Sequence, residues 1–191
     1  METARNAELR ALAQRLADAF PPVVVEVVLT GSVSRGVADE FSDIEMLALT
    51  EEQLSLEETF ALAERAGLTD TETWGDPATA TRRVHGYLDG QSIETIWWYR
   101  ELAEERFATT PSAEAIANGV PLRGGDWLAS AHRRLADFSD ERVCELCESA
   151  AERWGGWTPR GILTITRNDT ALARMEWLAA RRSARCRSST P

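Results

Sequence analysis

The sequence predicts an α+β fold, with a sheet and helices in the first half of the chain and helices alone in the second. Apolar β-branched runs and a hairpin signal occur only before residue 100, and after Tyr99 the periodic segments have helical spacing. A chain of 191 residues can form one domain or two small ones. We therefore expect an α/β domain over residues 1–100, a helical domain over residues 101–180 and a flexible tail over residues 181–191.

The first half alternates helices with pairs of strands. Leucines and alanines at helical spacing predict the first helix, which Pro21 and Pro22 end. A β-branched run broken only by Glu26 predicts a buried strand, and Asp89-Gly90 is typical of a tight hairpin turn. The expected elements are helix 4–19, strands 23–29 and 43–50, helix 55–67, and strands 82–88 and 91–98.

The second half predicts helices without any convincing strand. Ser112 and Asp140 stand where helix N-caps are expected. The expected helices cover residues 101–107, 112–118, 126–138, 140–154 and 168–180.

The charge of the chain limits its partners. The formal net charge is −10, and the 21 basic side chains are all arginine. This balance argues against duplex nucleic acid as a partner, and it would suit a cationic substrate as well as simple solubility. No apolar run reaches the length of a membrane span, and the N-terminus lacks the apolar core of a secretory signal. Three cysteines without such a signal favour reduced thiols, so we expect a cytoplasmic protein with no membrane contact.

A glycine and a serine follow the first predicted strand directly. Gly31 lets the backbone approach a ligand closely, and Ser32 offers a hydroxyl. Backbone N–H groups at the start of a helix bind anions, so this turn would suit a phosphate. An ordinary turn without a ligand is the alternative interpretation.

Two carboxylates stand at alternate positions where the next strand begins. Asp43 and Glu45 point to one face of a strand, while Ile44 points to the other. Close carboxylate oxygens suit Mg²⁺. The exposed edge of an amphipathic strand would explain the same pattern, but the apolar continuation over residues 46–49 favours a central strand.

A third carboxylate, Glu94, lies in the apolar sequence SIETIWW. If its strand lies beside the Asp43 strand, three carboxylates converge, and they could hold two Mg²⁺ ions that clamp a triphosphate. Glu94 could also accept a proton from an attacking hydroxyl. A solvated glutamate on the outer sheet face is the alternative. Trp98 shares the strand face of Glu94 and is the best candidate among the tryptophans for a site residue, although core packing explains most of them.

The combined pattern resembles the signature of the polymerase-β-type nucleotidyltransferase superfamily. The signature is Gly-Ser, about ten residues, Asp-hydrophobic-Asp/Glu on a strand, and an acid on a later strand. The segment GSVSRGVADEFSDIE is similar to that of bacterial members, including aminoglycoside and lincosamide nucleotidyltransferases and minimal nucleotidyltransferases. The resemblance implies a mixed-sheet nucleotidyltransferase core followed by a helical C-terminal domain.

The resemblance also implies roles for particular residues. Gly31, Ser32 and Arg35 would bind the nucleotide, with Arg35 as the first candidate for a phosphate clamp in a chain without lysine. The carboxylates of Asp43, Glu45 and Glu94 would be catalytic and would bind two Mg²⁺ ions. The second metal carboxylate is a glutamate where aspartate is commoner.

The expected activity is transfer of a nucleoside monophosphate from ATP or another NTP to a hydroxyl of a small-molecule acceptor. An aminoglycoside-like antibiotic is the leading acceptor. Two alternatives stay open: a protein-modifying enzyme of the minimal antitoxin type, and a catalytically weak nucleotide-binding module of the same fold. The chain could act alone or as a homodimer.

Overall fold

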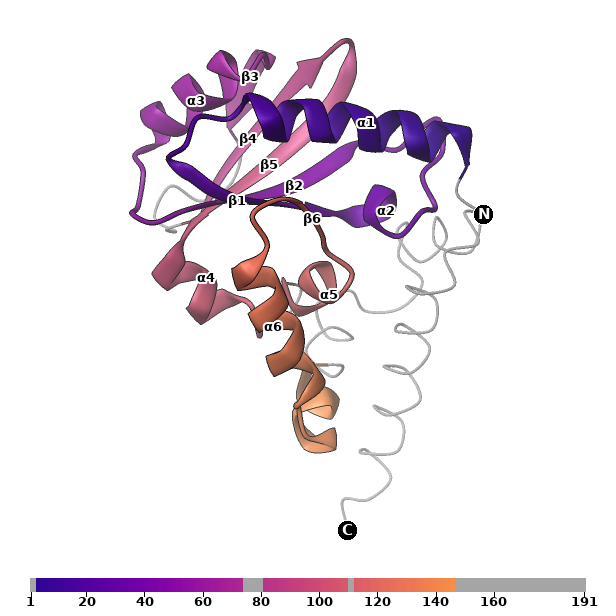
Figure 1. Cartoon of the computed structure of the whole chain (residues 1–191), viewed down its shortest axis with the longest axis vertical. Coiled ribbons are helices and arrows are strands. Elements are labelled where there is room, and N and C mark those ends of the chain that lie inside the picture. The colour runs from indigo at the N-terminus through magenta and orange to yellow at the C-terminus, as the bar shows by residue number, and fades with distance from the viewer. Residues whose placement is uncertain (1–2, 74–80, 110–111, 147–191) are drawn as a thin grey trace.

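The computed structural model describes residues 3–73, 81–109 and 112–146, which form one six-stranded sheet with helices on both faces (Figure 1). The strand order is β3-β4-β5-β2-β1-β6. The helices are α1 (Ala4–Ala19), α2 (Gly31–Ser34), α3 (Leu56–Arg65), α4 (Arg100–Arg106), α5 (Ser112–Ala117) and α6 (Asp126–Ala136). The strands are β1 (Val24–Thr30), β2 (Ile44–Thr50), β3 (Thr69–Thr73), β4 (Arg82–Leu88), β5 (Gln91–Tyr99) and β6 (Val120–Arg123).

The sheet is mixed. Strand β2 pairs in parallel with β5, and every other neighbouring pair is antiparallel. The hairpin predicted around Asp89-Gly90 is present, because both residues have positive φ and β4 pairs with β5 on either side of them. The predicted α+β class with a mixed sheet is therefore confirmed for the described residues.

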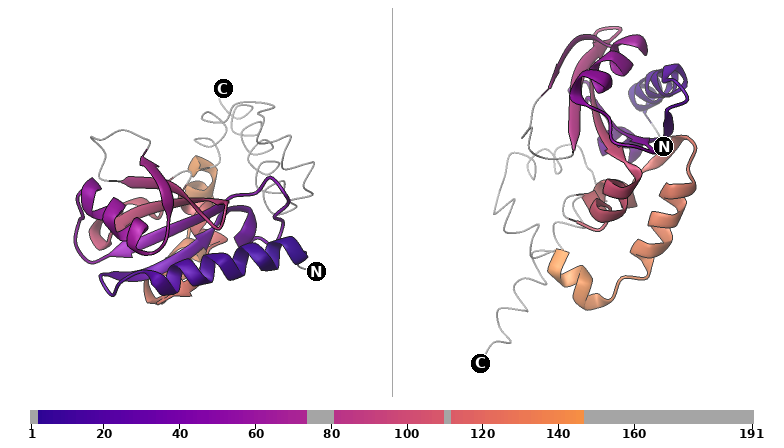
Figure 2. Two further views of the ribbon diagram at one scale, coloured as in Figure 1. Left: turned by 90° about the horizontal axis from the view of Figure 1, so that it is seen from above. Right: turned by 90° about the vertical axis from the view of Figure 1, so that its left-hand side faces the viewer.

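Two hydrophobic cores lie on opposite faces of the sheet. Helices α1 and α3 cover one face, where Leu9 and Leu16 pack against Val27 and Met46. Helices α4, α5 and α6 cover the other face, where Trp127 packs with Leu47. The turned views in Figure 2 show the sheet between these two layers of helices. The central strands β1 and β2 contribute to both cores, which explains their nearly continuous apolar sequence.

The structure differs from the predicted elements at two sheet edges. The prediction of no strand after Tyr99 is wrong, because β6 pairs with β1. Because β6 is short and contains Pro121, the sequence shows no clear strand pattern there. An edge strand tolerates a proline, since one side of it makes no ladder hydrogen bonds. At the other edge, the polar strand β3 was also not predicted.

Most of the predicted helices of the second half are confirmed within one or two residues. Helices α4, α5 and α6 match the expected segments, and residues 140–146 are helical. The remainder of helix 140–154, helix 168–180 and the tail lie outside the described residues. None of the helices in the described ranges has the length and apolar character that a membrane crossing requires.

A buried glutamate attaches α6 to the sheet. The side chain of Glu26, in β1, is almost fully buried and accepts hydrogen bonds from the backbone nitrogens of Trp127 at 2.7 Å and Leu128 at 3.4 Å. These are orphan donors in the first turn of α6, where a negative charge is also favoured by the helix dipole. Gly124 lies so close to β1 that a Cβ there would be 2.6 Å from Glu26 Cγ. Glu26, which interrupts the apolar sequence of β1, thus caps the N-terminus of α6 with its side chain.

We expect Glu26→Ala to lower the free energy of unfolding by about 2–4 kcal/mol, because two buried N–H groups lose their acceptor. Denaturant unfolding measures this change. Glu26→Gln keeps one acceptor oxygen and should cost clearly less, and Glu8→Ala, at an exposed position of α1, should be nearly neutral. Equal costs for the alanine and glutamine variants of Glu26 would contradict the capping role.

Candidate active site

The turn after β1 is shaped by a glycine that packs on a carboxylate. Strand β1 ends at Thr30, and Gly31 starts the single helical turn α2 with a φ of +69°. A Cβ at Gly31 would overlap the Glu45 side chain, whose Cδ would lie 2.9 Å away. Gly31 and Ser32 are both buried. The backbone of Gly31 therefore lies directly against the carboxylate of Glu45.

Helix α1 holds this turn in place through one buried asparagine. The side chain of Asn6 donates to the carbonyl of Val33 at 3.2 Å and accepts from the backbone nitrogen of Ala38 at 3.2 Å. Asn6 is fully buried, so both bonds are shielded from water. Polar atoms of one side chain thus fix both ends of the segment that follows α2.

Asp43 and Glu45 lie at the start of β2. Ile44 between them is buried in the core, Glu45 is half-buried, and Asp43 is exposed just before the strand. This alternation is the one that the sequence predicted. The chain before Asp43 is tied to β5, because the Gln91 amide donates to the carbonyl of Ser42 at 2.9 Å.

Glu94 of β5 stands beside Glu45. The parallel register of β2 and β5 pairs Glu45 with Glu94, and the antiparallel register of β1 and β2 pairs Glu45 with Thr30. Registered residues on neighbouring strands point to the same face of the sheet. The two glutamates therefore share one face, on the same side of the sheet as α4, α5 and α6.

Glu94 also forms an ion pair that the sequence analysis did not foresee. Arg83 Nη1 of β4 donates to Glu94 Oε1 at 2.9 Å, and the Glu94 side chain is only 12% exposed. Burial raises the pKa of the Glu94 carboxyl above its ordinary value, while the charge and hydrogen bond of Arg83 oppose the rise. The negative charge of Asp43 adds to the rise. A glutamate with a raised pKa is better matched to proton transfer near neutral pH.

The hairpin contains the signal that could have identified the residues facing Glu94. Counting outward from Asp89-Gly90 pairs His85 with Glu94, and the structure shows this pairing. His85 and Arg83 are two residues apart and therefore lie on the same face of β4. His85 Nε2 lies 3.0 Å from the hydroxyl of Ser92.

Arg35 lies in a different environment from the one expected of a phosphate clamp. Its guanidinium pairs with the carboxylate of Glu114 in α5 at 3.1 Å, and the Arg35 side chain is only 7% exposed. This ion pair connects the turn after α2 to the helices on the same face of the sheet.

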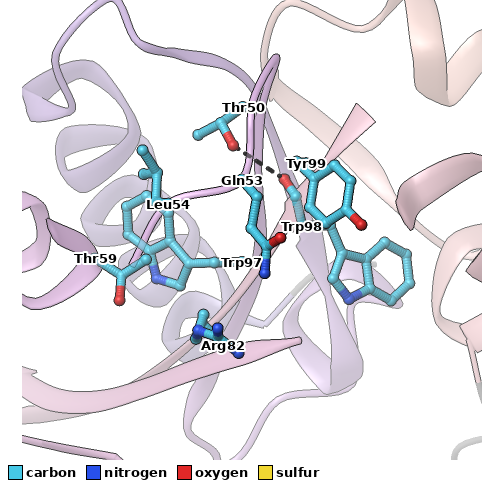
Figure 3. Close-up of a pocket in the computed structure, with 8 residues that line it drawn as sticks. All are labelled: Thr50, Gln53, Leu54, Thr59, Arg82, Trp97, Trp98 and Tyr99. Carbon is cyan, nitrogen blue, oxygen red and sulfur yellow. Dashed lines mark hydrogen bonds between the residues drawn. The ribbon is translucent and has the colours of Figure 1, made fainter. Parts of the chain in front are cut away.

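Trp98 lies away from the three carboxylates. It is four positions beyond Glu94 along β5, about 13 Å at the rise of a strand. Trp98 is buried in the core against α4 and α6, so the structure favours core packing for it. Figure 3 shows the side chains of Trp97 and Trp98 on opposite sides of their strand, at a pocket lined by the last residues of β5. Thr50 donates to the Trp98 carbonyl there at 3.5 Å. Trp154, Trp157, Trp177 and Cys147 lie outside the described residues.

The donor types at the site fit a hard divalent cation. Asp43, Glu45 and Glu94 offer carboxylate oxygens, which Mg²⁺ prefers. Within residues 3–73, 81–109 and 112–146, no group of three or more histidine, cysteine, aspartate or glutamate side chains already stands close enough to hold a metal ion. Glu94 forms a hydrogen-bonded ion pair with Arg83. To bind a metal ion, the Glu94 carboxylate would have to bind both partners at once or release Arg83.

Part of the first half of the chain matches a known family model. Residues 9–72 match the family model described as a nucleotidyltransferase domain. The matched segment contains Gly31, Ser32, Asp43 and Glu45, and it ends before β4 and Glu94. The match supports nucleotidyl transfer as the general type of activity.

A solved structure gives a further comparison. The crystal structure of a nucleotidyltransferase-like protein from Exiguobacterium sibiricum 255-15 aligns with 94% of this chain at 11% sequence identity and a TM-score of 0.40. This chain spans about half of that protein, 52% of its length. No curated protein sequence matches the chain.

We expect Gly31→Ala to disrupt the site, because its Cβ would collide with the Glu45 side chain and the backbone has positive φ. The variant should lose about 2–3 kcal/mol of unfolding free energy in denaturant titrations. Gly36→Ala is the matched control, since Gly36 has a φ of +76° and no atom within 4 Å of a Cβ built there. If both variants lose the same stability, backbone conformation alone explains the effect and the contact with Glu45 is unimportant.

Proposed function

We propose that this protein is a Mg²⁺-dependent nucleotidyltransferase that transfers a nucleoside monophosphate, with ATP as the leading donor, to a hydroxyl of a small molecule. The observation that carries the proposal is the meeting of Glu45, Glu94 and Gly31 at one end of the central strands. Asp43 lies two residues before Glu45, and its negative charge raises the pKa of Glu94. A phosphate-binding turn beside three carboxylates is the arrangement that nucleotidyl transfer requires.

Each residue of the site has a distinct task in this proposal. The backbone at Gly31 and the hydroxyl of Ser32 would hold the phosphates of the nucleotide. Asp43, Glu45 and Glu94 would hold Mg²⁺, which when bound neutralises the phosphate charge and stabilises the attacking and leaving oxygens. The turn is fixed by Asn6 before any ligand arrives, so little ordering is needed on binding.

In the transfer step, one bond to phosphorus forms, another breaks and one proton is transferred. The hydroxyl oxygen of the acceptor forms a bond to the α-phosphorus, and the bond from that phosphorus to the bridging oxygen of the β-phosphate breaks. Pyrophosphate leaves with the electron pair of this bond. Glu94 would accept the proton of the hydroxyl, a role that its raised pKa supports.

A second candidate is a module that binds a nucleotide without transferring it. The observation that favours it is the ion pair of Glu94 with Arg83, which engages the third carboxylate. Transfer to a partner protein is a further outcome that the same assay detects. The expected aminoglycoside-like acceptor is one arm of the test.

The test is transfer of label from α-³²P-ATP in the presence of Mg²⁺ to a panel of hydroxyl compounds that includes aminoglycosides, and to proteins of a cell extract. We expect Asp43→Asn and Glu45→Gln each to lower transfer by roughly 100-fold or more, because each removes a charged metal ligand. Calorimetry should show the same variants weakening Mn²⁺ binding at least about tenfold.

Glu52→Gln, an exposed carboxylate after β2, serves as the control and should change neither quantity. Binding of ATP and Mn²⁺ without transfer to any acceptor would favour the nucleotide-binding module. Binding that is insensitive to Asp43→Asn and Glu45→Gln would refute the proposed metal site.

A further inference from the structure

We propose that Arg83 and His85 of β4 form the acceptor subsite of this enzyme and select a small acceptor that carries a carboxylate or phosphate near its reacting hydroxyl. The inference rests on the proposed function, because it takes the carboxylates as the centre of the reaction. It differs from the expectation of an aminoglycoside-like acceptor, which would be cationic.

The strand order determines on which side of the carboxylates each substrate lies. The order β4-β5-β2-β1 places the turn that begins at Gly31 on one side of Glu45 and Glu94, and it places Arg83 on the other. Neighbouring strands are about 4.8 Å apart, so β1 and β4 are separated by about 14 Å. The turn and Arg83 therefore approach Glu45 and Glu94 from opposite sides.

The geometry of in-line displacement then assigns the two sides. The attacking and leaving oxygens stand on opposite sides of the phosphorus. If the turn at Gly31 holds the phosphates that leave as pyrophosphate, the acceptor hydroxyl approaches from the side of β5 and β4. Arg83 and His85 are the side chains that β4 presents on the face of Glu94 at this point.

The guanidinium of Arg83 is suited to bind an anion while it stays with Glu94. It is 34% exposed, in contrast to the 7% of Arg35, whose charge is committed to Glu114 inside the protein. A guanidinium has five N–H donors in one plane and can therefore hold a protein carboxylate and a substrate anion together. This makes Arg83 better placed than Arg35 to meet a substrate.

His85 lies beside Arg83 on the same face of β4. It lies directly across from Glu94, and its side chain is 20% exposed. Its Nε2 contacts the Ser92 hydroxyl, and its Nδ1 lies 3.4 Å from an oxygen of the exposed Glu72 on β3. Among the described residues, the titratable groups around the subsite are Arg83 and His85, with Glu94, Glu45, Asp43 and Glu72 at its borders. A cationic acceptor would have to lie against Arg83, which disfavours it.

Four probes with a common three-carbon skeleton test the acceptor class: glycerol 3-phosphate, glycerate, glycerol and 3-amino-1,2-propanediol. The chain has two histidines, so His132→Gln assigns the ring signal of His85 in a ¹H–¹³C spectrum. We expect that signal to shift saturably with the phosphate and the carboxylate, and to stay unchanged with glycerol and the amine. Whichever anion binds more tightly identifies the preferred group.

The role of Arg83 is tested with Arg83→Gln and Arg83→Lys. We expect Arg83→Gln to weaken binding of the anionic probes at least tenfold and Arg83→Lys to restore part of the loss. In transfer assays, Arg83→Gln should raise KM for the anionic acceptor more than it lowers kcat. Arg100→Gln is the matched control, because Arg100 forms a comparable ion pair with Glu51 at the other end of β5 and should leave both readouts unchanged.

Three results would overturn the inference: equal or stronger shifts with the amine, anion binding that does not depend on Arg83, or an equal fall of kcat with every acceptor in Arg83→Gln. The last result would make Arg83 a positioning residue for Glu94. Failure of the proposed function is seen separately, as loss of ATP and Mn²⁺ binding that depends on Asp43. Transfer to an aminoglycoside together with unaltered His85 signals would preserve the proposed function and refute the anionic acceptor.

Discussion

The parallel pairing of β2 with β5 is the constraint on which the candidate site depends. This register places Glu45 beside Glu94, and the antiparallel partner β1 then brings Gly31 against the Glu45 side chain. A shift of one residue would turn Glu94 to the face of α1 and α3, where Ile93 is now buried. The apolar residues that alternate with the carboxylates therefore fix the site, because they can be buried in only one register.

Each face of the sheet carries its own layer of helices and its own buried polar contacts. On one face, α1 supplies core leucines and also Asn6, which fixes the turn after α2. On the other face, α4, α5 and α6 cover the sheet next to the carboxylates, and Glu26 and Arg35 attach α6 and α5 to it. Buried polar residues thus connect each layer of helices to the strands that carry the site.

The charges around Glu94 differ from what the net charge of the whole chain suggests. Glu45 and Glu94 lie side by side on neighbouring strands, and burial makes the ionised form of Glu94 costly. Arg83 offsets part of this cost across the hairpin. The net charge of −10 belongs to the whole chain and does not describe this environment.

The sequence by itself determined the α+β class, the hairpin at Asp89-Gly90 and the alternation of Asp43, Ile44 and Glu45, because periodicity and turn chemistry are local properties. Only the tertiary structure decided the parallel neighbour of β2, the edge strand β6 and the partners of the buried charges. Glu26 interrupts an apolar strand because it caps a helix about a hundred residues away, and Arg35 pairs with Glu114 instead of facing solvent. Such long-range pairs leave no periodic trace, since they depend on which surfaces the packed sheet and helices bring together.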